Sequence, residues 1–226
     1  LETMTHSDMT DFTLLLHQLV QTHPGVLIEV LNDKFDAIFA KFTQTLSVQV
    51  SLKSDEEVEY NEIRRLIFTF FQTLVHSSML PILNSNKNIG NLENVFSLLL
   101  SGFGCGDASV EKSSYIAFTG MVNVWGNTSN PLQGFMEFMY LHLPNMLFHS
   151  LVSCTSDDTF VEAVQLEKAL LERRGEEFER FLASCIQGLG CSADMANQYT
   201  YAIHNSTKQA FLKYKRDFIK NGGRSQ

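Results

Sequence analysis

The C-terminal segment holds the side chains best suited to bind a charged ligand. Residues 206–226 contain six basic side chains and a single acid, Asp217, whereas the whole chain has a formal charge of −8 at pH 7. Lysine and arginine clustered on an otherwise acidic protein are typical of a contact with backbone phosphates. The candidate residues for binding RNA are Lys208, Lys213, Lys215, Arg216 and Lys220.

The same segment also has an apolar side. Its aromatic residues recur at helical spacing and form one stripe: Phe211, Tyr214 and Phe218. The basic residues opposite this stripe are Lys213, Arg216 and Lys220, with Lys208 and Lys215 flanking them. We expect the stripe to pack and the basic side chains to face solvent. An ordinary solvated helix face would have the same composition, so both interpretations stay open.

Arg173 and Arg174 form a second, weaker candidate for binding RNA. They occupy the last turn of an expected helix that ends at Gly175. Basic side chains in a last turn also interact favourably with the helix dipole. The pair is therefore compatible with a purely structural role.

No arrangement of residues predicts catalysis. The stretch 102–106 is rich in glycine, but it follows a helix and lacks the Lys-Ser/Thr of a phosphate-binding loop, so we interpret it as a turn between helices. The seven histidines and four cysteines show no metal-ligand spacing, and no nucleophile lies beside a base. We therefore expect no enzyme activity, no cofactor and no metal. No apolar run approaches the length that spans a bilayer, and we expect no membrane insertion.

The front of the chain is predicted to form three helices. A segment capped by Ser7 or Asp8 should end near His23, because a residue that precedes proline avoids the helical region. The next helix covers about 24–46 and pairs with the first in antiparallel fashion. A capping box of Ser54 and Glu57 begins the third. Residues 84–91, rich in asparagine and serine, form the clearest loop.

Helical patterns continue to the end of the chain. They cover about 92–103, 107–125, 131–149, 159–175, 176–187, 193–204 and 206–221. Pro144 should kink or split the third of these helices, and Thr159 with Glu162 should cap the fourth. About ten helices with short links and no strand pattern predict an all-α fold. The recurrence of similar segments every 35–50 residues favours an α-solenoid of HEAT-like antiparallel pairs over an irregular bundle.

Several motifs follow one another in the order and spacing found in the exportin-T family. They are Glu62-x-Arg64-Arg65, Phe68, Phe70–Leu74, Leu92–Val95, Trp125-Gly126, Gly134-Phe135-x-x-Phe138-x-Tyr140, Arg173–Phe178 and Leu182. Over residues 55–220 the chain therefore resembles the C-terminal region of that family. Residues 150–158 are more polar than the family pattern, and residues 1–50 match only as amphipathic helices. The chain is identified as a divergent member.

The resemblance implies a transport receptor of the importin-β/karyopherin superfamily. Such a receptor binds transfer RNA together with the GTP-bound GTPase Ran in the nucleus, releases both in the cytoplasm, and contacts nucleoporins on the way. The main Ran contacts would lie in repeats outside this C-terminal fragment, whose repeats would help wrap the RNA. We expect a monomer that shuttles between nucleus and cytoplasm. The alternative is a helical scaffold that binds peptides or partner helices in its grooves and binds no RNA.

Overall fold

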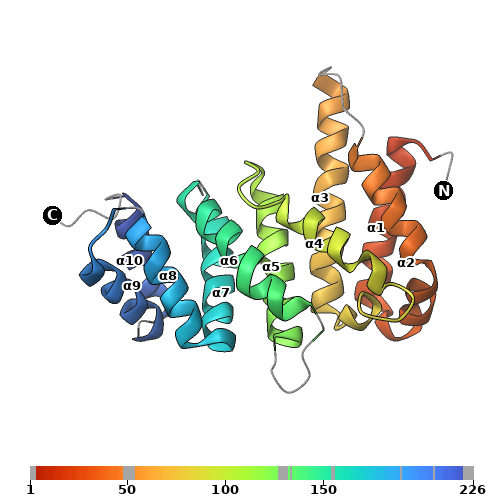
Figure 1. The fold of residues 1–226 in the computed structure, drawn as a ribbon. Helices are drawn as coiled ribbons and strands as arrows, with labels where there is room; N and C mark the ends of the chain where they lie inside the picture. Colours follow the sequence, from red (N-terminus) through yellow and green to blue (C-terminus); the bar gives the residue numbers. More distant parts are fainter. Residues whose placement is uncertain are drawn as a thin grey trace. The chain divides into compact units, whose positions relative to one another are not determined.

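A computed structural model describes residues 4–47, 54–126, 132, 134–153, 156–188, 190–205 and 207–220. The described residues form ten α-helices and two short 3-10 helices, with no strand among them (Figure 1). Leu, Phe, Met and Ala fill most buried positions, and helices tolerate these side chains well. The predicted all-α fold of helical pairs is therefore confirmed.

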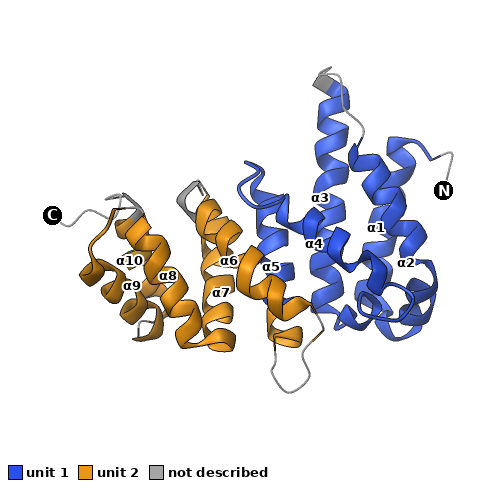
Figure 2. Cartoon of the chain, viewed as in Figure 1, with its two compact units in different colours: residues 1–121 blue, residues 122–226 orange. Residues whose placement is uncertain are grey.

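The chain divides into two compact units, residues 1–121 and 122–226, coloured separately in Figure 2. The first unit contains α1 (His6–Thr22), α2 (Pro24–Ser47), α3 (Ser54–His76), α4 (Leu92–Leu100) and most of α5 (Ala108–Trp125). The second unit contains α6 (Phe135–Ser153), α7 (Asp157–Arg174), α8 (Glu176–Gly188), α9 (Ala193–Asn205) and α10 (Lys208–Lys220). The division falls inside α5 and not at the polar loop 84–91.

An aromatic cluster joins α2 to α3 in the first unit. Phe39 stacks on Phe35, with ring centroids 5.8 Å apart, and meets Phe71 of α3 edge to face at 6.2 Å. Phe42 and Phe70 form a second edge-to-face pair at 5.6 Å. Because α1 packs along α3 and also touches α2, these three helices share one core. The expected pairing of α1 with α2 is thus present, but the more extensive partner of α1 is α3.

The polar loop 84–91 is bonded to α2. Asn88 is buried, and its side-chain amide donates to the carbonyl of Asn32, to the side-chain oxygen of Asn32 and to the carbonyl of Ile82. Lys87 pairs with Asp33 at the surface. The Asn88 side chain thus forms hydrogen bonds both to α2 and to the carbonyl of Ile82. These bonds hold the loop in a defined position although most of its residues are polar.

In the second unit, consecutive helices are neighbours along the chain: α6 contacts α7, α7 contacts α8, α8 contacts α9 and α9 contacts α10. Gly175 separates α7 from α8 with a φ of 57°, a conformation that glycine adopts without a steric penalty. Neighbour-to-neighbour packing of this kind is the arrangement of helical repeats.

Two predicted helix starts differ from the structure. The N-cap of α1 is Thr5, whose side chain accepts from the amide of Asp8, while Asp8 accepts from the amide of Thr5. Asp8 is therefore the third helical residue and not the cap. In α7 the helix begins at Asp157, so Thr159 lies inside the first turn, where its hydroxyl donates to the carbonyl of Ser156. The predicted capping box at Thr159 is wrong.

The predicted split at Pro144 is also absent. Helix α6 runs from Phe135 to Ser153 with the proline inside it. Proline removes only one N–H of the helix, and the buried side chains on both sides, Leu143 and Leu147, keep the two halves packed.

Removing the amide of Asn88 should destabilise the first unit. We expect Asn88→Ala to lower the free energy of unfolding by about 2 kcal/mol, because it leaves buried acceptors without a donor. The neighbouring Lys87 forms an exposed ion pair, and we expect Lys87→Ala to lower the free energy of unfolding by less than about 1 kcal/mol. Urea unfolding of the two variants measures this difference; equal effects would contradict the role of Asn88.

Candidate nucleic-acid interface

The aromatic stripe of α10 packs as predicted. Phe211 is fully buried, and its ring centroid lies 5.7 Å from that of Tyr199 in α9. Tyr214 and Phe218 lie at 6.1 and 5.1 Å from the same ring. Tyr199 is therefore the centre of the aromatic contact that holds α10 against α9.

Lys215 is not a surface residue, and its expected place beside the solvent-facing lysines is wrong. Only 2% of it is exposed, and its ammonium group is paired with the buried carboxylate of Glu167 in α7. The hydroxyl of Tyr199 donates to the two oxygens of that carboxylate, at 2.9 and 3.1 Å. Lysine, glutamate and tyrosine thus form one buried cluster that joins α7, α9 and α10.

The sequence contained a signal for this burial. Lys215 lies four residues after Phe211 and three before Phe218, so it belongs to the apolar stripe and not to its flank. Its ammonium group also lies 5.2 Å from the centroid of the Tyr199 ring. The long aliphatic stem can pack among aromatic side chains while the charge reaches Glu167.

Burial governs the electrostatics of the cluster. Loss of solvent raises the pKa of Tyr199 well above its usual range, and the adjacent Glu167 carboxylate raises it further. The phenol therefore stays protonated and can donate. Burial also lowers the pKa of Lys215, while the Glu167 carboxylate acts in the opposite direction. The carboxylate is thus the group that keeps a charged ammonium tolerable in this core.

The remaining basic side chains of α10 are more accessible. Lys213 is exposed and has no ion-pair partner among the described residues. Arg216 is partly exposed; its guanidinium lies 3.0 Å from the carboxylate of Asp157 and 5.7 Å from the ring centroid of Phe160. Lys208 and Lys220 are the first and last residues of α10, and their side chains lie outside the described part.

The second candidate pair, Arg173 and Arg174, makes contacts within the second unit. Arg174 is buried, and its guanidinium lies over the ring of Tyr140 at 4.2 Å, with Phe178 at 5.3 Å. Burial lowers its pKa, opposed by Tyr140 and Glu177. Its charged group stacks on aromatic rings inside the second unit, which favours the structural role over a contact with RNA. Arg173 is half-buried and donates to the carbonyl of Asn123 at 3.1 Å, near the end of α5.

Among the candidate residues whose side chains are described, Lys213 and Arg216 form one small basic surface on α10. Lys208 and Lys220 are the first and last residues of the same helix. Among the described residues, no three His, Cys, Asp or Glu side chains come together as a metal site. None of the helices described is long and apolar enough to cross a membrane. This surface can attract phosphate groups, and it contains no group placed for covalent chemistry.

Helices that pack neighbour to neighbour define an all-α helical-repeat protein. The model of the Exportin-T family matches residues 1–223, and the chain belongs to this family. The match includes residues 1–54, which the sequence motifs did not reach. It therefore extends the resemblance to nearly the whole chain.

Individual relatives are distant. Exportin-T of Mycosarcoma maydis is 24% identical over 97% of the chain, which covers 21% of that relative. Exportin-T of Danio rerio is 22% identical over 94% of the chain, and that of Oryza sativa is 23% identical over 94%; the chain covers 23% of each. The identities agree with a divergent member, and the chain spans about a quarter or less of the relatives' length.

The buried cluster yields a prediction about stability. Lys215→Met should lower the free energy of unfolding by about 3 kcal/mol, because Glu167 then keeps a buried charge without a cation. Replacing both residues, as Glu167→Leu with Lys215→Met, should recover most of that loss. The control Lys213→Met changes an exposed side chain and should stay within about 0.5 kcal/mol of the wild type. Urea unfolding measures all three; a Lys215→Met variant as stable as the control would contradict the role of the pair.

Proposed function

We propose that this chain is part of a nuclear export receptor for transfer RNA, and that the exposed side of α10 contributes contacts to the RNA backbone. Membership of the Exportin-T family supports the receptor role. The single structural observation that supports the contact is Lys213, an exposed cation without an ion-pair partner among the described residues.

Such a contact would recognise the charge and shape of the RNA backbone and would not depend on the base sequence. The described residues contain no strand that could carry stacking aromatics, and the aromatic rings of α10 are occupied by Tyr199. Lysine ammonium groups on a rigid helix can neutralise phosphates at a fixed spacing. Recognition through backbone and shape suits a folded RNA whose sequence varies from one molecule to the next.

The partners of the whole receptor belong to the same proposal. Transfer RNA would bind cooperatively with GTP-bound Ran, whose principal contacts lie in repeats outside this chain. Nucleoporins would be contacted during passage, and the receptor would shuttle between nucleus and cytoplasm as a monomer. We propose no catalytic step, since transport requires only that cargo affinity differ between the Ran-bound and Ran-free states.

Charge reversal on α10 tests this proposal in the full-length receptor. We expect Lys213→Glu combined with Lys208→Glu and Lys220→Glu to weaken binding of labelled transfer RNA in the presence of GTP-loaded Ran by at least about tenfold. The salt dependence of binding should also become shallower, because fewer counterions are released. Lys215 stays unchanged, since it is part of the core.

The matched control is Lys34→Glu, which reverses an exposed lysine on α2 and should leave RNA affinity unchanged. If the triple variant binds like the wild type, the receptor role stands but α10 is not part of the RNA surface. If the wild-type receptor binds no transfer RNA with or without Ran, the receptor role itself is wrong.

A further inference from the structure

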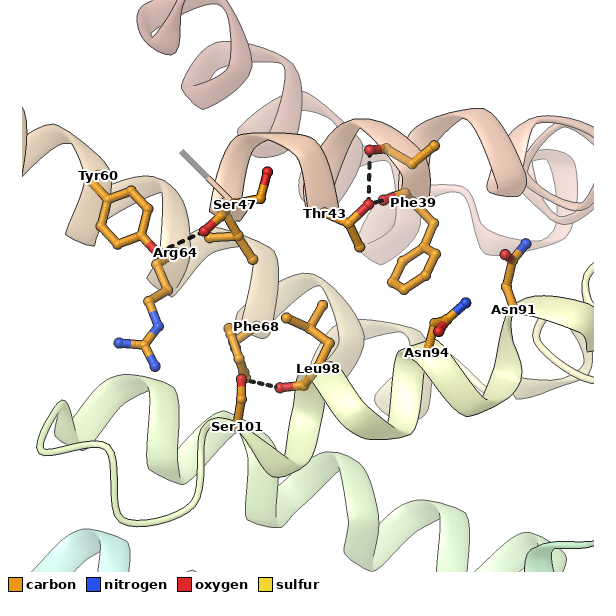
Figure 3. Close-up of a pocket in the computed structure, with 12 residues that line it drawn as sticks. Phe39, Thr43, Ser47, Tyr60, Arg64, Phe68, Asn91, Asn94, Leu98 and Ser101 are labelled. Atoms are coloured by element: carbon orange, nitrogen blue, oxygen red, sulfur yellow. Dashed lines mark hydrogen bonds between the residues drawn. The ribbon is translucent and has the colours of Figure 1, made fainter. Parts of the chain in front are cut away.

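A cavity of about 820 Å³ lies in the first unit, between α2, α3 and α4. Figure 3 shows its α2 side chains on one side, its α4 side chains on the other, and Phe68 of α3 between them. At one end Tyr60 donates to the carbonyl of Leu46, and at the other Asn91 donates to Asp36. We call this cavity the α2–α4 groove.

Among the described residues that line the groove, Arg64 is the only one with a charged side chain. Its guanidinium lies 5.8 Å from the ring centroid of Phe68, and it has no carboxylate partner among the described residues. Its neighbour Arg65, by contrast, donates to Asp107 at 2.7 Å. A half-buried arginine without an acidic partner favours a ligand that brings a carboxylate or a phosphate.

The rest of the lining is mixed. Leu46, Leu98 and Tyr60 offer partly exposed apolar surface. Polar groups from both walls border it: Thr43, Ser47, Asn91, Asn94 and Ser101. The amide of Asn94 is exposed and makes no hydrogen bond within the described chain, so it can both donate to and accept from a ligand.

This pattern favours an extended peptide over a helix. An α-helix satisfies its own backbone groups and needs an apolar groove, whereas an extended chain needs polar partners for its N–H and C=O groups. The groove offers such partners along both walls. Helix α4 has nine residues and rises about 14 Å, a length that about four extended residues would match.

The same surroundings disfavour RNA. The N-terminal half of α3 carries exposed carboxylates at Asp55, Glu56, Glu57, Glu59 and Glu62, on the helix that contributes Arg64. A polyanion would be repelled by them, whereas one carboxylate can pair with Arg64 at short range. The buried rings of Phe39 and Phe68 also offer no free face for stacking a base.

We propose that the α2–α4 groove binds an extended peptide segment of a partner protein, with an acidic side chain on Arg64 and apolar side chains on Leu46 and Leu98. The Asn94 amide bonds to the peptide backbone between them. This site lies in the first unit and is independent of the RNA contact proposed for α10. It gives the chain a protein-docking surface in addition to an RNA surface.

Synthetic peptides test the proposal with the whole chain. An array of peptides of about nine residues places one Glu between two apolar residues, and a matched array has Gln at the same position. The best Glu peptide and its Gln partner are then titrated by fluorescence anisotropy. We expect the Glu peptide to bind about tenfold more tightly, because it forms a charge-assisted pair with Arg64.

Two variants and one control locate the effect. Arg64→Gln should abolish the preference for Glu over Gln, and Lys34→Gln, which removes an exposed charge of α2 that does not line the groove, should leave it intact. Asn94→Ala should weaken both peptides equally, since it removes a backbone contact. Asn94 is exposed, so this variant remains informative even if Arg64→Gln is less stable.

Methyl resonances provide the position of binding. The Glu peptide should shift the methyl signals of Leu46 and Leu98. Equal binding of Glu and Gln peptides, a preference that survives Arg64→Gln, or shifts confined to other residues would overturn the proposal. So would an unpaired RNA oligonucleotide that shifts these two leucines when no peptide does.

Discussion

The buried cluster of Lys215, Glu167 and Tyr199 is the interaction on which the second unit depends. A buried ammonium and a buried carboxylate each lose several kcal/mol of hydration, so neither is stable there without the other. Three helices must therefore meet in one register for the charges to pair. Apolar packing alone would permit small rotations of α10, but the pair selects one rotation and thereby determines which basic side chains reach solvent.

The number and approximate position of the helices could be predicted directly from the sequence. The spacing of apolar residues predicted α1, α2, α5 and α7, and the helix-ending or helix-starting residues Pro24, Trp125-Gly126 and Gly175 placed their ends within a few residues of the observed bounds. Local caps were harder, because Thr5, Ser7 and Asp8 can all act as caps and only the backbone conformation decides among them. The pairing of α1 with α2 was predicted, but its more extensive packing against α3 was not, since that packing depends on contacts more than fifty residues apart.

The candidate site was predicted in part. Arginine and lysine were treated as surface residues because isolated buried charges are costly. That reasoning fails where another helix supplies an opposite charge, as Glu167 of α7 does for Lys215. It also fails where a guanidinium stacks on an aromatic ring, as Arg174 does on Tyr140. Both partners lie more than thirty residues away in sequence. The position of Lys215 within the aromatic stripe was the local signal, and it carried more information than the residue's charge.

Local charge, and not the net charge of −8, decides what each surface can bind. Interactions between exposed charges are largely screened beyond about 8 Å in physiological salt, so distant carboxylates scarcely affect a phosphate at α10. There Lys213 has no ion-pair partner among the described residues, and a backbone phosphate can also compete with Asp157 for the neighbouring Arg216. At α3 a single free guanidinium lies on a helix rich in carboxylates, and it suits one acidic side chain far better than a polyanion. The same acidic chain can thus present two surfaces with opposite preferences, since each is selected by charges within one Debye length.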